Sequence, residues 1–275
     1  MCFRDHFVDL NRLRLHYCQW GAIDAPPVLL LHGGSAHAHW WDLFAGAVAD
    51  RYRVIALDLR GHGDSAYADP PAYRIADYAS DVEALVDHLG VPGFHLIGHS
   101  LGAMIAGAFA VARRECLLSL TLVDAQMRFT AAGVRYLQRL ARFPRLTYPD
   151  RETAVHRFRV LPTQTSATRD VIEQMGTWAL RENSNGRWVL KFDRAALGQL
   201  EPVDLLPALA ALDVPMCLVR GQHSTVLTHE RVSAILTQLP QARLVEIADA
   251  HHHVMLDNPT AFTRAVGAFI DAVKV

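Results

Sequence analysis

This sequence of 275 residues lacks the features that would indicate a membrane, a nucleic acid or a secreted protein. No apolar run approaches the roughly 18 residues that a membrane-spanning helix needs. The charges nearly cancel, with 27 basic and 28 acidic side chains and a formal net charge of −1. We therefore expect no basic surface for nucleic acid or anionic lipid, and no partner of either kind.

Cysteine is scarce as well. The four cysteines lie far apart and show neither C-x-x-C nor disulfide-framework spacing: Cys2, Cys18, Cys116 and Cys217. The first twenty residues contain no apolar segment after a basic start, which a secretory signal peptide would show. We therefore expect reduced thiols and a cytoplasmic location.

The order of apolar segments indicates how the chain is organised. Short buried strands such as VLLLHGG and RVIALDL alternate with helical patterns, which is typical of a mostly parallel sheet with helices on both faces. In the middle of the chain, helical periods at 133–143 and 168–183 and no evident buried strand predict a helical insertion. We predict an α/β core of residues 1–126 and 201–275, interrupted by residues 127–200.

The segment GHSLG, Gly98 to Gly102, carries the clearest chemical signal. It matches G-x-S-x-G and stands between an expected strand, FHLI, and an expected helix, AMIAGAFAVA. A turn this sharp needs small neighbours and lifts the serine hydroxyl clear of the sheet. We therefore interpret Ser100 as a nucleophile, with the N–H of Leu101 pointing into the same space.

An acyl-transfer site needs a second N–H group to stabilise the developing oxyanion. The turn after VLLLHGG ends a neighbouring strand with Gly33 and Gly34, where the backbone can approach a ligand closely. We predict the Gly34 N–H as this donor. The alternative interpretation is that the two glycines only form a turn.

Four segments follow one another along the chain: HGG, DLRGHGDS, GHSLG and a late histidine before LDNP. In this order and spacing they resemble the α/β-hydrolase fold family over nearly the whole chain. The resemblance implies an eight-stranded, mostly parallel sheet flanked by helices, with residues 127–200 as a helical cap after strand 6. It also implies a serine, an acid and a histidine in that chain order, and a reaction without a cofactor. DLRGHGDS is expected to be a scaffold loop in which Asp58, Arg60 and Asp64 bond backbone groups or each other.

The three consecutive histidines at 251–253 offer three candidates for the base. In the family, the histidine stands seven positions before a proline that opens the last helix, and counting back from Pro259 gives His252. His251 and His253 are interpreted as loop or pocket-edge residues. No metal site is expected here, because adjacent residues on an extended loop project in different directions and no second ligand cluster accompanies them.

The sequence does not directly identify the carboxylate that would orient the histidine. Where many family members carry an aspartate after the strand MCLVRG, this sequence has Thr225, and Glu230 comes later, at an expected helix start. The chain therefore either lacks the acid or takes it from elsewhere. Asp124 ends the sixth strand, where certain lipases, dehalogenases and a mycotoxin lactonase of this fold carry the acid, and we predict that it orients His252. Asp257 is interpreted as a cap of the final helix.

Five residues are assigned to the substrate pocket: Gly33, Trp41, Met127, Met175 and Trp178. The first two follow or form the expected oxyanion turn, and the other three lie in the insertion. For the four large side chains, packing between helices or against the sheet is an equally good interpretation.

The leading functional hypothesis is a serine hydrolase that cleaves a carboxylic ester or lactone of a small to medium hydrophobic substrate through an acyl-enzyme. Dehalogenase and epoxide hydrolase chemistries on this fold use an aspartate nucleophile, so Ser100 argues against both. Two alternatives stay open: a C–C bond hydrolase of ring-cleavage products, and a ligand-binding member of the fold without turnover. The sequence is compatible with a homodimer.

Overall fold

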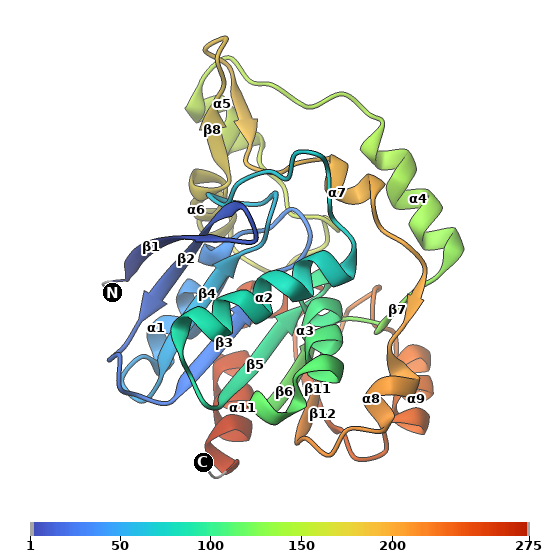
Figure 1. Ribbon diagram of the computed structural model, residues 1–275. Helices are drawn as coiled ribbons and strands as arrows, with labels where there is room; N and C mark the ends of the chain where they lie inside the picture. Colours follow the sequence, from blue (N-terminus) through green and yellow to red (C-terminus); the bar gives the residue numbers. More distant parts are fainter. Residues whose placement is uncertain (1–2, 274–275) are drawn as a thin grey trace.

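One sheet of eight strands forms the centre of the molecule, for which the computed structural model describes residues 3–273 (Figure 1). The strands are β1 (Arg4–Leu10), β2 (Leu13–Trp20), β3 (Pro27–Leu31), β4 (Arg53–Asp58), β5 (Phe94–His99), β6 (Leu117–Val123), β11 (Met216–Gly221) and β12 (Arg243–Ile247). They lie side by side in the order β1-β2-β4-β3-β5-β6-β11-β12. The pairs β1–β2 and β2–β4 are antiparallel and the other pairs are parallel. The expected mostly parallel sheet of eight strands is confirmed.

Helices cover both faces of this sheet: α1 (Asp42–Val48) and α11 (Pro259–Ala272) on one face, and α2 (Ile75–Leu89), α3 (Leu101–Ala112) and α9 (His229–Gln238) on the other. The side chains of β3 alternate between the two layers. Leu29 and Leu31 join the core under α2 and α3, whereas Val28 and Leu30 join the core under α1 and α11. Because both faces are buried, the strand is apolar at successive positions, as the sequence suggested.

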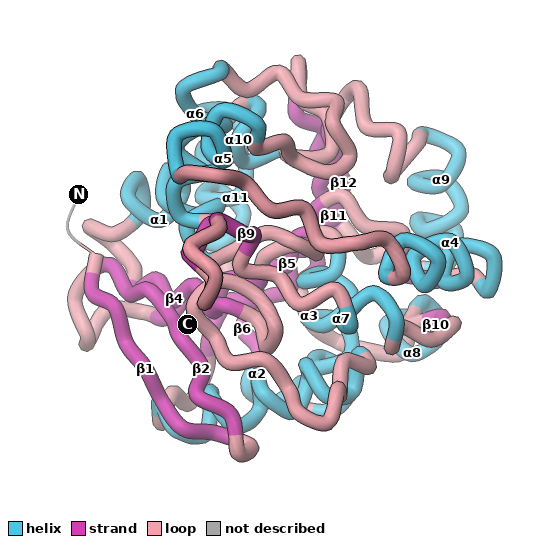
Figure 2. The backbone as a smooth tube through the Cα atoms, turned by 90° about the horizontal axis from the view of Figure 1, so that it is seen from above, coloured by secondary structure: helices cyan, strands magenta, loops and turns pink. Residues whose placement is uncertain are grey.

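The insertion lies between β6 and β11. Its elements are β7 (Arg128–Phe129), α4 (Ala131–Ala141), α5 (Arg151–Arg157), α6 (Arg169–Trp178), β8 (Leu180–Glu182), β9 (Trp188–Leu190), α7 (Ala195–Gly198) and β10 (Val203–Asp204), followed by α8 (Leu206–Ala210). β7 pairs with β10 in antiparallel fashion, so the insertion leaves and rejoins the core through one short stem. α4 packs with α7, and α5 packs with α6 on the opposite side of the molecule (Figures 1 and 2).

The prediction of one helical period over residues 168–183 is wrong in its second part, and this part of the insertion contains two short, partly buried strands where no buried strand was evident. α6 ends at Trp178, and β8 then pairs with β9 in a small antiparallel hairpin. Its turn contains Gly186 at φ 69°, a left-handed conformation that glycine adopts easily. Strands of three residues carry too short a pattern to be read, and their pairing depends on contacts made elsewhere in the fold.

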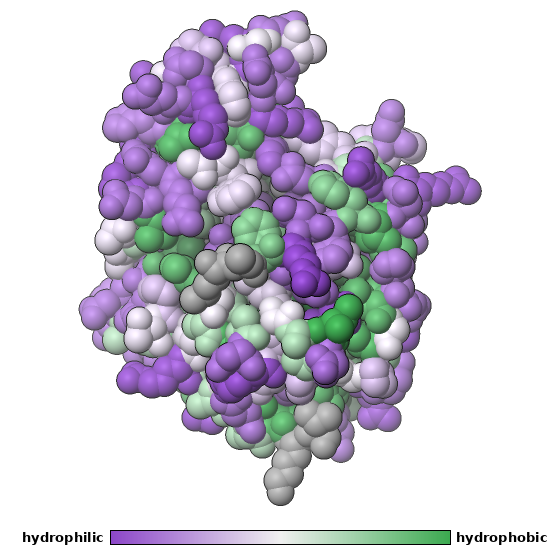
Figure 3. Space-filling view, turned by 90° about the vertical axis from the view of Figure 1, so that its left-hand side faces the viewer, coloured by the Kyte–Doolittle hydropathy of each residue, from purple (hydrophilic) through white to green (hydrophobic). Residues whose placement is uncertain are grey.

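Figure 3 shows the face of the molecule that carries the N-terminal strand, at the left of Figure 1. Hydrophilic side chains cover much of this face, and apolar side chains appear as separate patches between them. No helix within residues 3–273 combines the length and the apolar character needed to cross a membrane.

Candidate active site

Ser100 stands on a sharp turn between β5 and α3. Its backbone adopts φ 54° and ψ −114°, a conformation that costs a non-glycine residue on the order of 1–3 kcal/mol. A Cβ on Gly98 would lie 2.3 Å from the Gly102 carbonyl oxygen, and a Cβ on Gly102 would lie 2.2 Å from the Leu31 carbonyl oxygen. The close approach of β5, α3 and β3 therefore explains both glycines of GHSLG and holds Ser100, half-buried, where β5 ends.

The turn that follows β3 lies beside Ser100. A Cβ on Gly33 would come within 3.2 Å of the Ser100 Cβ, and a Cβ on Gly34 would lie 3.9 Å from the Leu101 side chain. In the part of the chain that the structure describes, the Gly34 N–H has no hydrogen-bond acceptor. Leu101 is the first residue of α3, where an N–H group has no partner within the helix. Two backbone donors are therefore available beside Ser100.

His252 lies on the loop between β12 and α10 (Val254–Asp257), and its Nδ1 is 2.8 Å from Asp124 Oδ1. Both side chains are buried. Asp124 directly follows β6, at a positive φ of 47°. Its carboxylate also accepts hydrogen bonds from the Ser224 hydroxyl at 2.6 Å and from the Gly221 N–H at 2.9 Å. Three donors therefore fix the carboxylate in place, and His252 is one of them.

The other carboxylate considered from the sequence lies elsewhere. Glu230 is exposed in the first turn of α9, and Thr225 is exposed on the loop before that helix. Ser224, the residue before Thr225, is the one that turns inward and bonds Asp124. The structure thus brings Asp124 to His252 and leaves Glu230 at the surface.

His99 connects the serine turn to the histidine loop. Its Nε2 donates to the His252 carbonyl oxygen at 2.9 Å, and the two rings lie 4.6 Å apart between centroids. Burial holds the pKa of His99 well below its ordinary value, so the ring is neutral. Within residues 3–273 no hydrogen bond joins Ser100 Oγ to His252 Nε2. Catalytic contacts of this kind are often long before substrate binds and tighten in the complex.

Two further histidines bind the insertion to the core. His253 Nε2 donates to the Pro162 carbonyl oxygen at 2.7 Å, and His37 Nε2 donates to the Met175 carbonyl oxygen at 3.0 Å. Burial lowers the pKa of each histidine to about 3, so both rings act as neutral donors. The interpretation of His253 as a loop or pocket-edge residue did not anticipate this contact. The sequence offered a histidine beside the base as a signal, but it could not identify a partner 91 positions away.

Asp257 joins the same loop to the insertion. Its carboxylate accepts the His251 N–H at 2.7 Å and, from the insertion, the Thr165 hydroxyl and the Ser166 N–H at 2.9 Å. The cap of α11 is the following residue, Asn258. The prediction that Asp257 caps the final helix is wrong, because its oxygens are turned toward the insertion and the histidine loop.

We expect Asp257→Asn to loosen this connection. An amide NH₂ cannot accept the donors that face the carboxylate, so the free energy of unfolding should fall by about 1–3 kcal/mol, and any catalytic turnover should fall several-fold as the His252 loop gains freedom. Urea denaturation and steady-state kinetics measure the two effects. Asp213→Asn, at an exposed position, is the matched control and should change neither. Equal stability of the two variants would contradict this role of Asp257.

The four large side chains assigned to the substrate pocket lie in different environments. Trp41 is fully buried against phenylalanines of α1 and α11, and Met127 is fully buried beside α3. Both side chains therefore pack within the hydrophobic clusters on the two faces of the sheet, and their assignment to the pocket stays a prediction. Met175 packs inside the insertion, and Trp178 lies partly exposed with its ring stacked 3.9 Å from that of His39. Gly33 alone of the five lies beside Ser100.

Known proteins match this chain over most of its length. A family model described as the alpha/beta hydrolase fold matches residues 26–259. The pimeloyl-acyl-carrier-protein methyl ester esterase of Aeromonas hydrophila is 28% identical over 250 residues, which cover 89% of this chain and 95% of that protein. The 3-oxoadipate enol-lactonase 2 of Acinetobacter baylyi is 25% identical, with 96% of each chain covered. The crystal structure of E-2-(acetamidomethylene)succinate hydrolase matches with a TM-score of 0.86 at 24% identity, over 98% of this chain and 100% of the other.

Proposed function

The chain belongs to the alpha/beta hydrolase fold family and is a hydrolase, and from this premise we propose that it cleaves a carboxylic ester or lactone with Ser100, His252 and Asp124. The observation that carries the proposal is the 2.8 Å contact between His252 Nδ1 and Asp124 Oδ1, on the same sheet edge as a serine in a strained turn. We further propose that residues 127–200 act as a cap over a core of residues 1–126 and 201–275.

In the proposed reaction, the Ser100 hydroxyl attacks the substrate carbonyl while His252 Nε2 accepts its proton. Asp124 accepts the Nδ1–H of His252, which leaves Nε2 as the basic atom of the neutral ring and stabilises the imidazolium once it forms. His252 then gives the proton to the leaving alkoxide, and an acyl-enzyme remains. A water molecule, deprotonated by His252, attacks the acyl carbon, releases the carboxylic acid and restores Ser100.

The oxyanion of each tetrahedral intermediate needs donors that are already in place. The N–H groups of Gly34 and Leu101 fit this role, because both lie beside Ser100 and neither is taken up by the backbone around it. A side chain at position 33 would lie against Ser100 and would obstruct the substrate carbonyl, because a Cβ on Gly33 would come within 3.2 Å of the Ser100 Cβ.

The bond type rests on two kinds of support. The names of two relatives that match over nearly their whole length specify a methyl ester and an enol-lactone as substrates. A serine hydrolase cleaves either bond by acyl transfer. The absence of an acid at Thr225 had kept open the alternative of a ligand-binding protein without turnover, and the contact of Asp124 with His252 supports a working triad instead. We propose a small to medium hydrophobic ester or lactone as the substrate.

A fluorophosphonate probe tests this proposal directly. We expect it to modify Ser100 in the folded protein, as mapped by mass spectrometry, and we expect p-nitrophenyl acetate or butyrate to be hydrolysed. Ser100→Ala should remain unlabelled while keeping the same circular dichroism spectrum. Folded wild-type protein that neither reacts with the probe nor hydrolyses any of a panel of esters and lactones would contradict the proposal. A panel that includes vinylogous diketones also detects C–C bond hydrolysis.

A further inference from the structure

A second cluster of reactive side chains lies on the β1–β2 hairpin. Side chains alternate along a strand, so His16 and Cys18, two positions apart on β2, share one face. Asp5 on β1 is the direct cross-strand partner of Cys18, which places its side chain on that same face. The 3₁₀ helix η1 (Ala38–Trp41) then brings His39 against Cys18.

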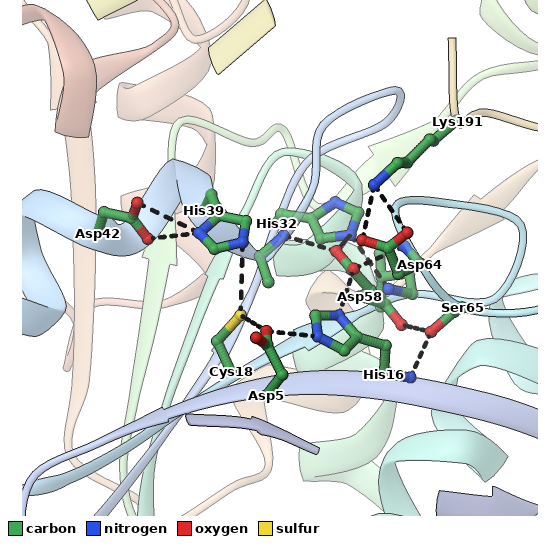
Figure 4. A network of polar contacts seen from close by, with 12 residues as sticks. Asp5, His16, Cys18, His32, His39, Asp42, Asp58, Asp64, Ser65 and Lys191 are labelled. Carbon is green, nitrogen blue, oxygen red and sulfur yellow. Dashed lines mark hydrogen bonds and ion pairs between the residues drawn. The ribbon is translucent and has the colours of Figure 1, made fainter. Parts of the chain in front are cut away.

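The contact distances within this cluster are short (Figure 4). His16 Nε2 lies 3.0 Å from Asp5 Oδ1, and Cys18 Sγ lies 3.7 Å from the same oxygen. His39 Nε2 lies 3.7 Å from Cys18 Sγ. Cys18 and the two histidines are buried, while the Asp5 side chain is 55% exposed and opens the cluster to solvent.

Each histidine is held by a second carboxylate at its other ring nitrogen. His16 Nδ1 bonds Asp58 Oδ2 at 2.7 Å, and His39 Nδ1 bonds Asp42 Oδ1 at 3.0 Å. Because carboxylate oxygens only accept here, both Nδ1 atoms carry protons. His39 Nε2 faces the Cys18 thiol, whereas His16 Nε2 faces the Asp5 carboxylate and also carries a proton until an ion displaces it. This pairing of ligand, histidine and outer carboxylate is the usual arrangement around protein-bound zinc.

We propose that Asp5, His16 and Cys18, with His39 as the fourth ligand, bind a zinc ion. One thiolate, two imidazoles and one carboxylate match the ligand preferences of Zn²⁺. Zinc bonds of about 2.0–2.3 Å in a tetrahedron place neighbouring ligand atoms about 3.3–3.6 Å apart. The ligand atoms of Asp5, His16 and Cys18 all lie within 4.8 Å of one another, and His39 Nε2, 3.7 Å from Cys18 Sγ, would move toward the ion to complete the set. Binding requires the thiolate and unprotonated Nε2 atoms, so the Cys18 thiol proton and any Nε2 proton leave as the ion enters.

The surrounding charges also favour a cation. Four carboxylates belong to the network drawn in Figure 4, and one lysine faces them: Asp5, Asp42, Asp58 and Asp64, with Lys191. Lys191 bonds Asp64 at 2.7 Å, on the side of the network away from Cys18, so the carboxylates nearest Cys18 are not neutralised by it. Asp58 also accepts a hydrogen bond of 2.7 Å from the backbone N–H of Ala38, the first residue of η1, so the same carboxylate holds both His16 and the helix that carries His39.

Such an ion would fasten the edge hairpin to the segment after the oxyanion turn. Through the ring of His39, stacked on Trp178 at the end of α6, it would also stabilise the contact with the insertion. The proposed ligands make no contact with Ser100, His252 or Asp124, so we assign the zinc a structural role that is independent of ester hydrolysis.

Cobalt substitution tests the site on the whole chain without a histidine tag. We expect metal-free protein to bind one equivalent of Co²⁺ with a sulfur-to-cobalt charge-transfer band, and zinc to displace it. Zinc held 100-fold above its Kd should raise the Tm by at least about 5 °C. Cys18→Ser should abolish both the charge-transfer band and the rise in Tm. Cys116→Ser, which changes a partly exposed thiol on η2 (Arg114–Cys116), is the matched control and should retain both.

Two results would overturn the proposal. One is wild-type protein that shows no charge-transfer band at excess cobalt, and the other is the same band in Cys18→Ser. Asp5→Asn covers the case in which the cysteine variant does not fold, because this exposed side chain tolerates the change; it should weaken zinc binding at least tenfold, and unchanged affinity would also overturn the site. Ester turnover is not a readout, so this outcome is separate from that of the proposed function.

Discussion

Asp124→Asn should lower kcat by about 10⁴-fold while leaving the protein folded. An asparagine can present its NH₂ to His252 Nδ1, which favours the tautomer with the proton on Nε2, and the atom that should accept the Ser100 proton is then already occupied. The imidazolium also loses its counter-charge. The Gly221 N–H keeps its acceptor, because it bonds the other oxygen, Oδ2, where the amide oxygen then lies. Ser224 bonds the same Oδ1 position as His252, so its hydroxyl must turn and accept from the NH₂ instead, and the loop should stay in place. Steady-state ester hydrolysis and circular dichroism together measure the result.

The matched control is Glu230→Gln, which makes the same chemical change on the exposed first turn of α9. It should retain wild-type turnover. Near-wild-type activity of Asp124→Asn, or inactivity of Glu230→Gln, would contradict the assignment of the acid.

The sequence could predict the parts of this molecule that depend on local geometry. The strained turn at Ser100 requires Gly98 and Gly102 because backbone atoms approach within van der Waals distance, and that requirement appears directly as G-x-S-x-G. Likewise, strands buried on both faces must be apolar at successive positions, so β3, β5 and β6 could be recognised. The family resemblance then supplied the order of the remaining parts.

Contacts between distant segments could not be predicted. Asp257 stands just before a helix and is a residue type that often caps one. Its oxygens instead bond a segment about 90 residues earlier in the chain, and only the folding of the insertion brings that segment near. Trp41 and Met127 follow the expected oxyanion turn and the acid within a few residues, and the sequence alone did not indicate that both side chains are fully buried. The Asp5–Cys18 pair depends on the register of the β1–β2 hairpin, which no motif records.

Acid should unfold this protein near pH 5. Burial lowers the pKa of six buried histidines from 6.5: to about 3 in His32, His37 and His253, to about 4 in His62 and His95, and well below 6.5 in His99. In the unfolded chain these rings bind protons below pH 6.5, whereas in the folded protein they remain neutral until pH 3–4. Unfolding therefore takes up protons, and stability that is fully present above pH 6.5 is lost as the pH falls through this window.

One histidine acts in the opposite direction. In the metal-free protein, burial disfavours its charged form, but the hydrogen-bonded carboxylate of Asp58 outweighs this and raises the pKa of His16, so its contribution is present below pH 6.5 and is lost as the pH rises. Near pH 5 His16 is protonated in both states and does not affect the slope, so the six buried histidines set an uptake of about six protons on unfolding. At about 1.4 kcal/mol per proton and pH unit, the free energy of unfolding should fall by roughly 8 kcal/mol per pH unit. A domain with a stability of about 5–15 kcal/mol then unfolds at about pH 5 or somewhat above.

Urea denaturation at half-unit steps from pH 8 to pH 5 measures this slope. His95→Gln should reduce it by about one proton, because a glutamine can still bond the Ser119 hydroxyl, which lies 2.8 Å from His95 Nδ1, but does not titrate. His88→Gln, at an exposed position of α2, should leave the slope unchanged. Stability that stays constant from pH 7.5 to pH 5 would show that the buried histidines take up protons without unfolding. His37 and His253, the neutral histidines that bond the insertion to the core, account for about two of these protons.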